Sequence, residues 1–126
     1  MSKTQDGFVK GRLKSLRYAF RGMLMLVRSE HSIMVQLAIG VLVSILGFLL
    51  DISPTEWMLQ TICVGMVLSA EGLNTAVEKL CDFEHPGPDP RIGRIKDIAA
   101  GGVGFAAVIA FVVGLIIYAP KVANLF

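Results

Sequence analysis

The sequence IAAGGVGFAAVIAFVVGLIIYA occupies residues 98–119 and contains no charged side chain. As an α-helix this run would be about 33 Å long, which matches the roughly 30 Å hydrocarbon core of a bilayer. A second uncharged run occupies residues 33–50 and is only slightly shorter. Each run therefore predicts a transmembrane helix.

A third apolar run, residues 57–70, is shorter and ends at a glutamate. Apolar side chains then continue at helical spacing, so we predict one helix over 54–82. Its start is marked by Ser53 and Glu56, spaced as in a capping box, and by Pro54 at the first helical position. Counting this helix as a third span, the predicted fold class is an all-α membrane protein.

The composition agrees with a membrane location. Hydrophobic residues make up 54% of the 126 residues and charged residues only 17%, and the mean hydropathy is +0.65. Average soluble domains carry about 25% charged residues. A small soluble protein needs a larger share of polar residues, because its ratio of surface to volume is higher. These values exclude a soluble monomer, a disordered protein and a multidomain protein. We interpret residues 1–126 as a single integral-membrane domain.

The charges are distributed unevenly along the chain. Residues 1–30 hold seven cations and two acids, segment 82–97 holds three further cations, and the link 51–56 holds none. Because cytoplasmic flanks of membrane spans are enriched in Lys and Arg, we predict a cytoplasmic N-terminus and an external C-terminus. Trp57 and Tyr118 then fall at the outer interface, where an aromatic belt is expected.

Residues 8–30 combine basic and apolar positions at helical spacing. Most of the cations fall within a sector of about 60° on a helical wheel, and large apolar side chains fill a second sector. We predict an amphipathic helix on the inner leaflet, and the open alternative is a plain basic flank without a further role. Nucleic-acid binding is not supported, because the basic face is short and adjoins the membrane spans.

The segment FEHPGPDPRIGRI at residues 83–95 contains Pro86, Pro88 and Pro90. Proline lacks an amide hydrogen and disrupts helix interiors. We therefore predict that this segment is not helical and forms a stiff extended connection between the last two spans.

Three polar side chains of the helix 54–82 stand where a span should be apolar. Asn74 and Glu78 follow Glu71 by three and seven residues, which places all three on one helix face. Glu71 lies about 26 Å along the axis from Pro54, so the cluster lies at the cytoplasmic end of the span. Ionisable groups inside spans are costly and usually mark a function.

Further charged residues reach the same level from other segments. Glu30 comes just before the first span, and Lys96 and Asp97 come just before the last. Carboxylates suit a hard cation such as Mg²⁺, and a lysine beside it suits the neutralisation of phosphate. A remaining carboxylate could accept a proton from an alcohol. Together these groups are what phosphoryl transfer requires.

Structural interpretations of the same residues stay open. Glu71 and Glu78 could form ion pairs with nearby cations that hold the helices together, and Asn74 could hydrogen-bond between helices. Lys96 and Asp97 could be an ordinary charge pair at a helix start. Their convergence on one leaflet favours the functional interpretation.

The stretch EGLNTAVE at residues 71–78 resembles the signature E-x-x-N-[ST]-A-[IV]-E of the prokaryotic diacylglycerol kinase family, which includes the undecaprenol kinases. The stretch GRIKD at residues 93–97 resembles the second conserved block of that family. The resemblance implies an N-terminal surface helix and three transmembrane helices, assembled as a homotrimer. It also implies active sites between protomers and MgATP as the phosphate donor.

The resemblance implies roles for individual residues as well. Glu71 matches the proposed catalytic base that activates the lipid hydroxyl, and Asn74 supports the surrounding cluster. Glu30 and Glu78 match the carboxylates that hold Mg²⁺. The positions that match nucleotide-site residues, or that could approach the phosphates, are Lys96, Asp97, Tyr18, Lys14 and Arg12.

We therefore expect a lipid kinase of the bacterial inner membrane that transfers the γ-phosphate of ATP to a membrane lipid alcohol. The product would be undecaprenyl phosphate or phosphatidic acid. Segments 53–57 and 74–79 look closer to undecaprenol kinases, and Met34 and Gln36 replace charged residues of Gram-negative diacylglycerol enzymes. The alternative from another class is a non-enzymatic membrane helper or assembly subunit, which would leave the gathered carboxylates unexplained.

Overall fold

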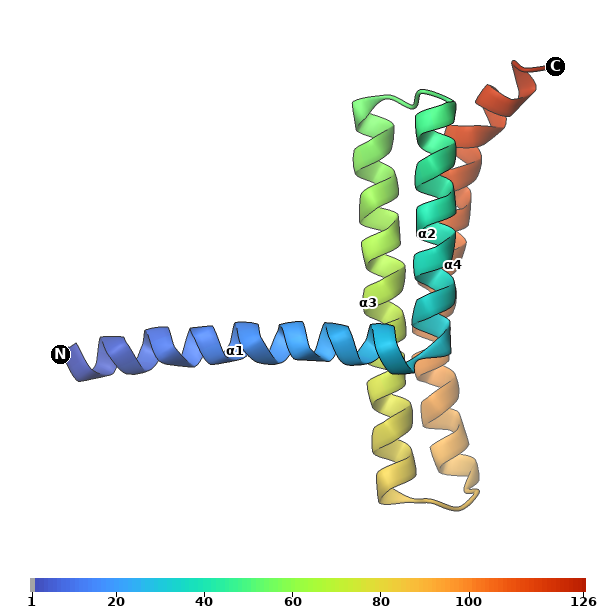
Figure 1. Ribbon diagram of the computed structural model, residues 1–126. Helices are drawn as coiled ribbons and strands as arrows, with labels where there is room; N and C mark the ends of the chain where they lie inside the picture. The colour runs from blue at the N-terminus through green and yellow to red at the C-terminus, as the bar shows by residue number, and fades with distance from the viewer. Residues whose placement is uncertain (1) are drawn as a thin grey trace.

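A computed structural model describes residues 2–126 of the chain. It contains the helices α1 (Ser2–Ser29), α2 (His31–Leu49), α3 (Pro54–Glu84) and α4 (Pro90–Ala123). Helices α2, α3 and α4 run side by side, and α1 leaves them sideways near the start of α2 (Figure 1). Residues 2–126 contain no strand. The predicted all-α class is confirmed, and each of the four segments predicted to be helical forms a helix.

The link between α2 and α3 is short and well defined. Asp51 has a φ of 53°, in the left-handed region that aspartate tolerates better than most residues. The predicted capping box is confirmed, because the Ser53 hydroxyl accepts a hydrogen bond of 3.1 Å from the Glu56 amide and Glu56 Oε1 accepts one of 2.9 Å from the Ser53 amide. At Gly47 an added Cβ would lie 3.0 Å from the Trp57 ring, so glycine permits this close approach of α2 and α3.

The prediction that residues 83–95 form an extended, non-helical connection is wrong at both ends of that range. Helix α3 continues to Glu84 and α4 begins at Pro90, so only residues 85–89 are non-helical. Proline can open a helix, because its fixed φ suits the first turn and its missing amide hydrogen would be unpaired there. Asp89 is the N-cap and accepts a hydrogen bond of 2.8 Å from the Arg91 amide. Helix α4 thus starts well before the predicted position 98.

Helix α1 meets the bundle part-way along α3 rather than at its end (Figure 1). Leu26 lies close to Gly72 at this crossing, where an added Cβ would stand 3.1 Å from the leucine Cδ1. Beyond the crossing, α3 and α4 continue together to the loop 85–89 (Figure 1). Glu71 is adjacent to Gly72, so the predicted catalytic residue lies where α1 crosses α3.

Much of the apolar surface of the chain is exposed. The accessible surface is 9631 Å², whereas a compact soluble protein of this mass would expose about 6,600 Å². Phe48 and Phe105, for example, are 78% and 77% exposed. Of the described helices, α2 and α4 are long and apolar enough to cross a membrane, while charged side chains interrupt the apolar run of α3. The excess apolar surface is expected of a protein that is surrounded by lipid or packed against other chains.

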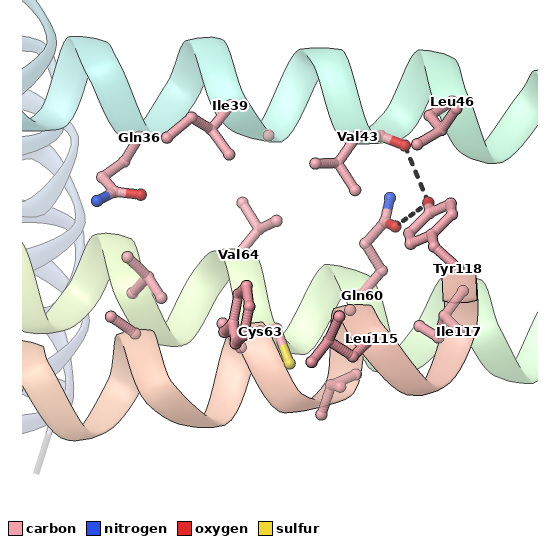
Figure 2. A pocket seen from close by; sticks show the side chains of 17 residues that line it. Gln36, Ile39, Val43, Leu46, Gln60, Cys63, Val64, Leu115, Ile117 and Tyr118 are labelled. Carbon is pink, nitrogen blue, oxygen red and sulfur yellow. Dashed lines mark hydrogen bonds between the residues drawn. The ribbon is translucent and has the colours of Figure 1, made fainter. Parts of the chain in front are cut away.

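Three polar groups meet between α2, α3 and α4 at the end far from α1 (Figure 2). The Tyr118 hydroxyl lies within hydrogen-bond distance of the Val43 carbonyl oxygen, at 3.0 Å, and of Gln60 Oε1. The Gln60 side chain is buried between the helices. Tyr118 thus connects three helices through its hydroxyl.

Candidate active site

The predicted polar face of α3 brings an amide next to a carboxylate. Asn74 Nδ2 donates a hydrogen bond of 3.3 Å to Glu78 Oε1. Asn74 Oδ1 is buried and has no hydrogen-bond partner in the part of the chain that the structure describes. Because buried polar atoms are normally paired, this oxygen indicates that a ligand, a water molecule or a second chain completes the site.

Among the side chains that the structure describes, neither Glu71 nor Glu78 forms an ion pair. The structure therefore does not support the alternative in which these two carboxylates form ion pairs that hold the helices together. Glu71 is half-buried.

Glu30 occupies the N-cap position of α2, but its side chain makes no capping hydrogen bond. Its Oε1 instead lies 3.2 Å from Lys79 Nζ on α3. The Lys79 side chain is 70% exposed, and exposed ion pairs contribute only about 0–1 kcal/mol. This ion pair is therefore a weak constraint on the position of Glu30. The contact brings Glu30 to the level of Glu78.

Lys96, predicted for the nucleotide site, forms an ion pair of 2.6 Å with Asp82. This contact joins α3 to α4 beyond the crossing of α1. Asp82 is missing from the predicted site, although it follows Glu78 by four residues and so extends the polar face of α3 by one turn. Asp97 is exposed next to Lys96.

The three α1 residues predicted to reach the nucleotide lie away from the rest of the site. Arg12, Lys14 and Tyr18 are exposed on the part of α1 that projects from the bundle (Figure 1). The Arg12 guanidinium lies over the Phe8 ring, 5.1 Å from its centroid. A single chain therefore does not bring these side chains to Lys96.

The described residues of one chain do not assemble a complete metal centre. Among them, no three Asp, Glu, His or Cys side chains stand close enough together to hold a metal ion. Mg²⁺ commonly takes only one or two protein carboxylates and completes its shell with waters and substrate phosphates. Glu30, Glu78 and the unpartnered Asn74 oxygen are hard oxygen donors of the kind that Mg²⁺ prefers.

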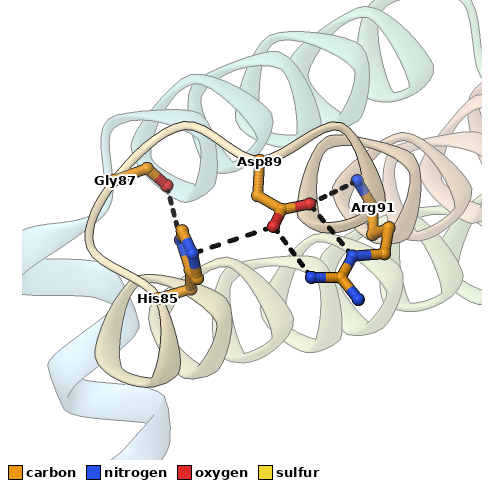
Figure 3. A network of polar contacts seen from close by, with 4 residues as sticks. All are labelled: His85, Gly87, Asp89 and Arg91. Carbon is orange, nitrogen blue, oxygen red and sulfur yellow. Dashed lines mark hydrogen bonds and ion pairs between the residues drawn. The ribbon is translucent and has the colours of Figure 1, made fainter.

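A separate polar network holds the loop between α3 and α4 (Figure 3). Arg91 Nη2 and Nε donate hydrogen bonds of 3.1 and 3.3 Å to the Asp89 carboxylate, and the His85 ring bonds to the Gly87 carbonyl oxygen at 2.8 Å. The Arg91 guanidinium holds the pKa of the Asp89 carboxyl below its ordinary value. The network defines where α4 begins and so helps to position Lys96.

Comparison with known proteins gives two matches. The family model described as prokaryotic diacylglycerol kinase matches residues 17–118. The chain is also 38% identical over 108 residues to the undecaprenol kinase of Bacillus subtilis strain 168, with 86% of this chain and 88% of the relative covered. The match to the family model includes every predicted site residue except Arg12 and Lys14.

Proposed function

Because the chain belongs to the prokaryotic diacylglycerol kinase family, and is therefore a membrane lipid kinase, we propose that undecaprenol is its acceptor and MgATP its donor. The products would be undecaprenyl phosphate and ADP. The name of the Bacillus subtilis relative and segments 53–57 and 74–79 of the sequence support this acceptor. Diacylglycerol is the second candidate, with phosphatidic acid as its product.

The observation that carries the proposal is a carboxylate, where α1 crosses α3, that has no cation partner among the described side chains. Glu71 accepts the proton of the lipid hydroxyl. The hydroxyl oxygen forms a bond to the γ-phosphorus while the bond from that phosphorus to the β-phosphate oxygen breaks, and ADP leaves. The half-buried position of Glu71 suits this role, because the lipid hydroxyl and the aqueous nucleotide can meet there.

Other residues bind and orient the nucleotide. Glu30, Glu78 and Asn74 are the residues that would hold Mg²⁺, which when bound neutralises charge on the phosphates. Lys96 supplies a further positive charge for the phosphates, and Asp97 lies beside it on α4. The exposure of Lys79 allows Glu30 to exchange its lysine partner for the metal ion.

A second protomer completes the site in this proposal. Arg12, Lys14 and Tyr18 project away from their own bundle, so they can contact a nucleotide only at the site of a neighbour. Such a head-to-tail contact closes into a ring, and a homotrimer is the arrangement that we propose. The exposed apolar surface and the unpartnered Asn74 oxygen support contacts with further chains.

The proposed orientation places α1 on the inner leaflet of the bacterial inner membrane. The N-terminus is then cytoplasmic, α2, α3 and α4 are the three transmembrane spans, and the C-terminus lies outside. The cations of α1 and of the start of α4 support this orientation, because positive charges are enriched on the cytoplasmic side. Residues near Lys96 would then extend toward the cytoplasm, where ATP is found.

The test is a phosphoryl-transfer assay with the purified protein in lipid nanodiscs. Radiolabelled ATP is supplied with undecaprenol or diacylglycerol in parallel, with and without Mg²⁺. We expect labelled undecaprenyl phosphate as the main product, and its loss when Mg²⁺ is chelated. A preference for phosphatidic acid would reassign the acceptor, and no labelled lipid from either alcohol would favour the non-enzymatic helper.

A further inference from the structure

One ion pair between α3 and α4 lies beyond the crossing of α1, where the two helices continue together toward their loop (Figure 1). Lys96 Nζ donates a hydrogen bond of 2.6 Å to Asp82 Oδ1. The Asp82 side chain is 65% exposed and the Lys96 side chain is 35% exposed. An ion pair with this much solvent contact contributes little to the free energy of unfolding. Its main consequence is therefore that the Lys96 ammonium has a fixed place.

That place is defined by the position of Asp82 along α3. Asp82 follows Glu71 by eleven residues, close to three helical turns, so both lie on the same face. Along the helix axis, Asp82 is about 16 Å from Glu71 and about 6 Å from Glu78. Lys96 is therefore held on the side of Glu78 that faces away from Glu71. In the proposed reaction this is the side of the nucleotide, because Glu71 marks the lipid hydroxyl and Glu78 the metal ion.

A lysine that binds phosphate gains from a partner that fixes it. Its side chain is long and flexible, so ordering it when a ligand binds costs conformational entropy. The ammonium group has three donors and no acceptor. Asp82 takes one of these donors, which leaves two for phosphate oxygens. A lysine already held by Asp82 can therefore bind a nucleotide without first being ordered.

We propose that Asp82 is a positioning residue of the nucleotide site, which holds the Lys96 ammonium at the level where the phosphates bind. This inference rests on the proposed kinase function. Asp82 acts on the nucleotide only through Lys96. Because the lipid hydroxyl lies at the level of Glu71, recognition of the lipid alcohol does not depend on Asp82.

The experiment removes the carboxylate from an exposed position. Asp82→Ala takes away the partner of Lys96, and Glu84→Ala is the matched control, because Glu84 is also an exposed acid near the end of α3. The dissociation constant of a non-hydrolysable MgATP analogue is measured by calorimetry, and KM is measured for ATP and for the lipid alcohol. We expect Asp82→Ala to weaken analogue binding and to raise the KM for ATP by about tenfold. The KM for the lipid alcohol, and all three constants of Glu84→Ala, should stay unchanged.

Two further variants separate positioning from a merely structural role. Asp82→Glu keeps the carboxylate and should recover most of the lost affinity, because the exposed site has room for one more methylene group. In the Lys96→Met background, Asp82→Ala should weaken analogue binding no further, because no ammonium remains to be positioned. A structural distortion would instead persist without Lys96 and would raise the KM for the lipid alcohol as well.

The outcomes distinguish this inference from the proposed function. Unchanged or tighter analogue binding by Asp82→Ala would overturn the positioning role and leave the kinase proposal intact. A loss of equal size in the Lys96→Met background, or an equal rise in both KM values, would overturn it too. Failure of the unmodified protein to bind the analogue would overturn the proposed function, and the positioning role with it.

Discussion

Replacing Tyr118 by phenylalanine tests how the helices are held together in the apolar part of the bundle. The substitution removes one hydroxyl and keeps the ring. That hydroxyl contacts the Val43 carbonyl oxygen of α2 and Gln60 Oε1 of α3. The Val43 carbonyl retains its partner within α2, because helical carbonyls bond to the amide four residues on. The Gln60 side chain, which is 6% exposed, is left without this partner.

The expected loss of stability follows from that unpaired amide. Leaving a buried polar group unsatisfied costs about 1–3 kcal/mol in soluble proteins. Side-chain hydrogen bonds between membrane helices average about 0.6 kcal/mol and reach about 1.7 kcal/mol. We therefore expect Tyr118→Phe to lower the free energy of unfolding by about 1–2 kcal/mol.

The assay is reversible unfolding in mixed detergent micelles, followed by circular dichroism, for Tyr118→Phe, Gln60→Leu and the double variant. The double variant should be less destabilised than the sum of the single variants, because neither polar partner is left alone. Tyr18→Phe is the control, since Tyr18 is 62% exposed on α1 and its stability effect should be negligible. Unchanged stability of Tyr118→Phe, or strictly additive effects, would refute the reasoning.

Three further predictions concern the site and the loop. Glu78→Gln should weaken Mg²⁺-dependent binding of a non-hydrolysable ATP analogue by about tenfold or more in calorimetry, and unchanged affinity at matched Mg²⁺ would count against a metal role. Glu71→Gln and Tyr18→Ala protomers, each inactive alone, are mixed in equal amounts. If each site takes Glu71 from one protomer and Tyr18 from its neighbour, a quarter of the sites are intact, so up to about a quarter of wild-type activity should return. No recovery would place each site within one chain. Because the pKa of Asp89 is lowered, its carboxylate stabilises the folded protein at pH values above the ordinary pKa of aspartate, and this stabilisation is lost as the pH falls through the lowered pKa. Hydrogen exchange corrected for intrinsic rates should therefore show the start of α4 opening in acid. Asp89→Asn should abolish this pH dependence.

The features that sequence could predict are those set by nearby residues. The capping box at Ser53 depends on three consecutive positions after it, and the shared face of Glu71, Asn74 and Glu78 depends only on the helical repeat. The long uncharged runs likewise predict helices directly. In each case the physical cause lies within one or two turns of chain.

The features that sequence could not predict depend on context between segments. Pro90 reads as a helix breaker in a proline-rich segment, and only its placement after the Asp89 N-cap turns it into the first residue of α4. The contact between Lys96 and Asp82 depends on how α3 and α4 are aligned across the loop. The inward direction of Tyr118 likewise depends on its neighbours on α2 and α3, which a rule for aromatic residues at interfaces ignores.

The most direct test of the central claim is the rate of phosphoryl transfer by Glu71→Gln. Protein in nanodiscs is given radiolabelled MgATP and undecaprenol, with Glu84→Gln, at the exposed end of α3, as the matched control. If Glu71 accepts the lipid proton, Glu71→Gln should lose at least about a hundredfold in rate, while its assembly and nucleotide binding stay unchanged and Glu84→Gln remains active. A Glu71→Gln protein that phosphorylates lipid at a rate close to that of the unmodified protein would contradict the account.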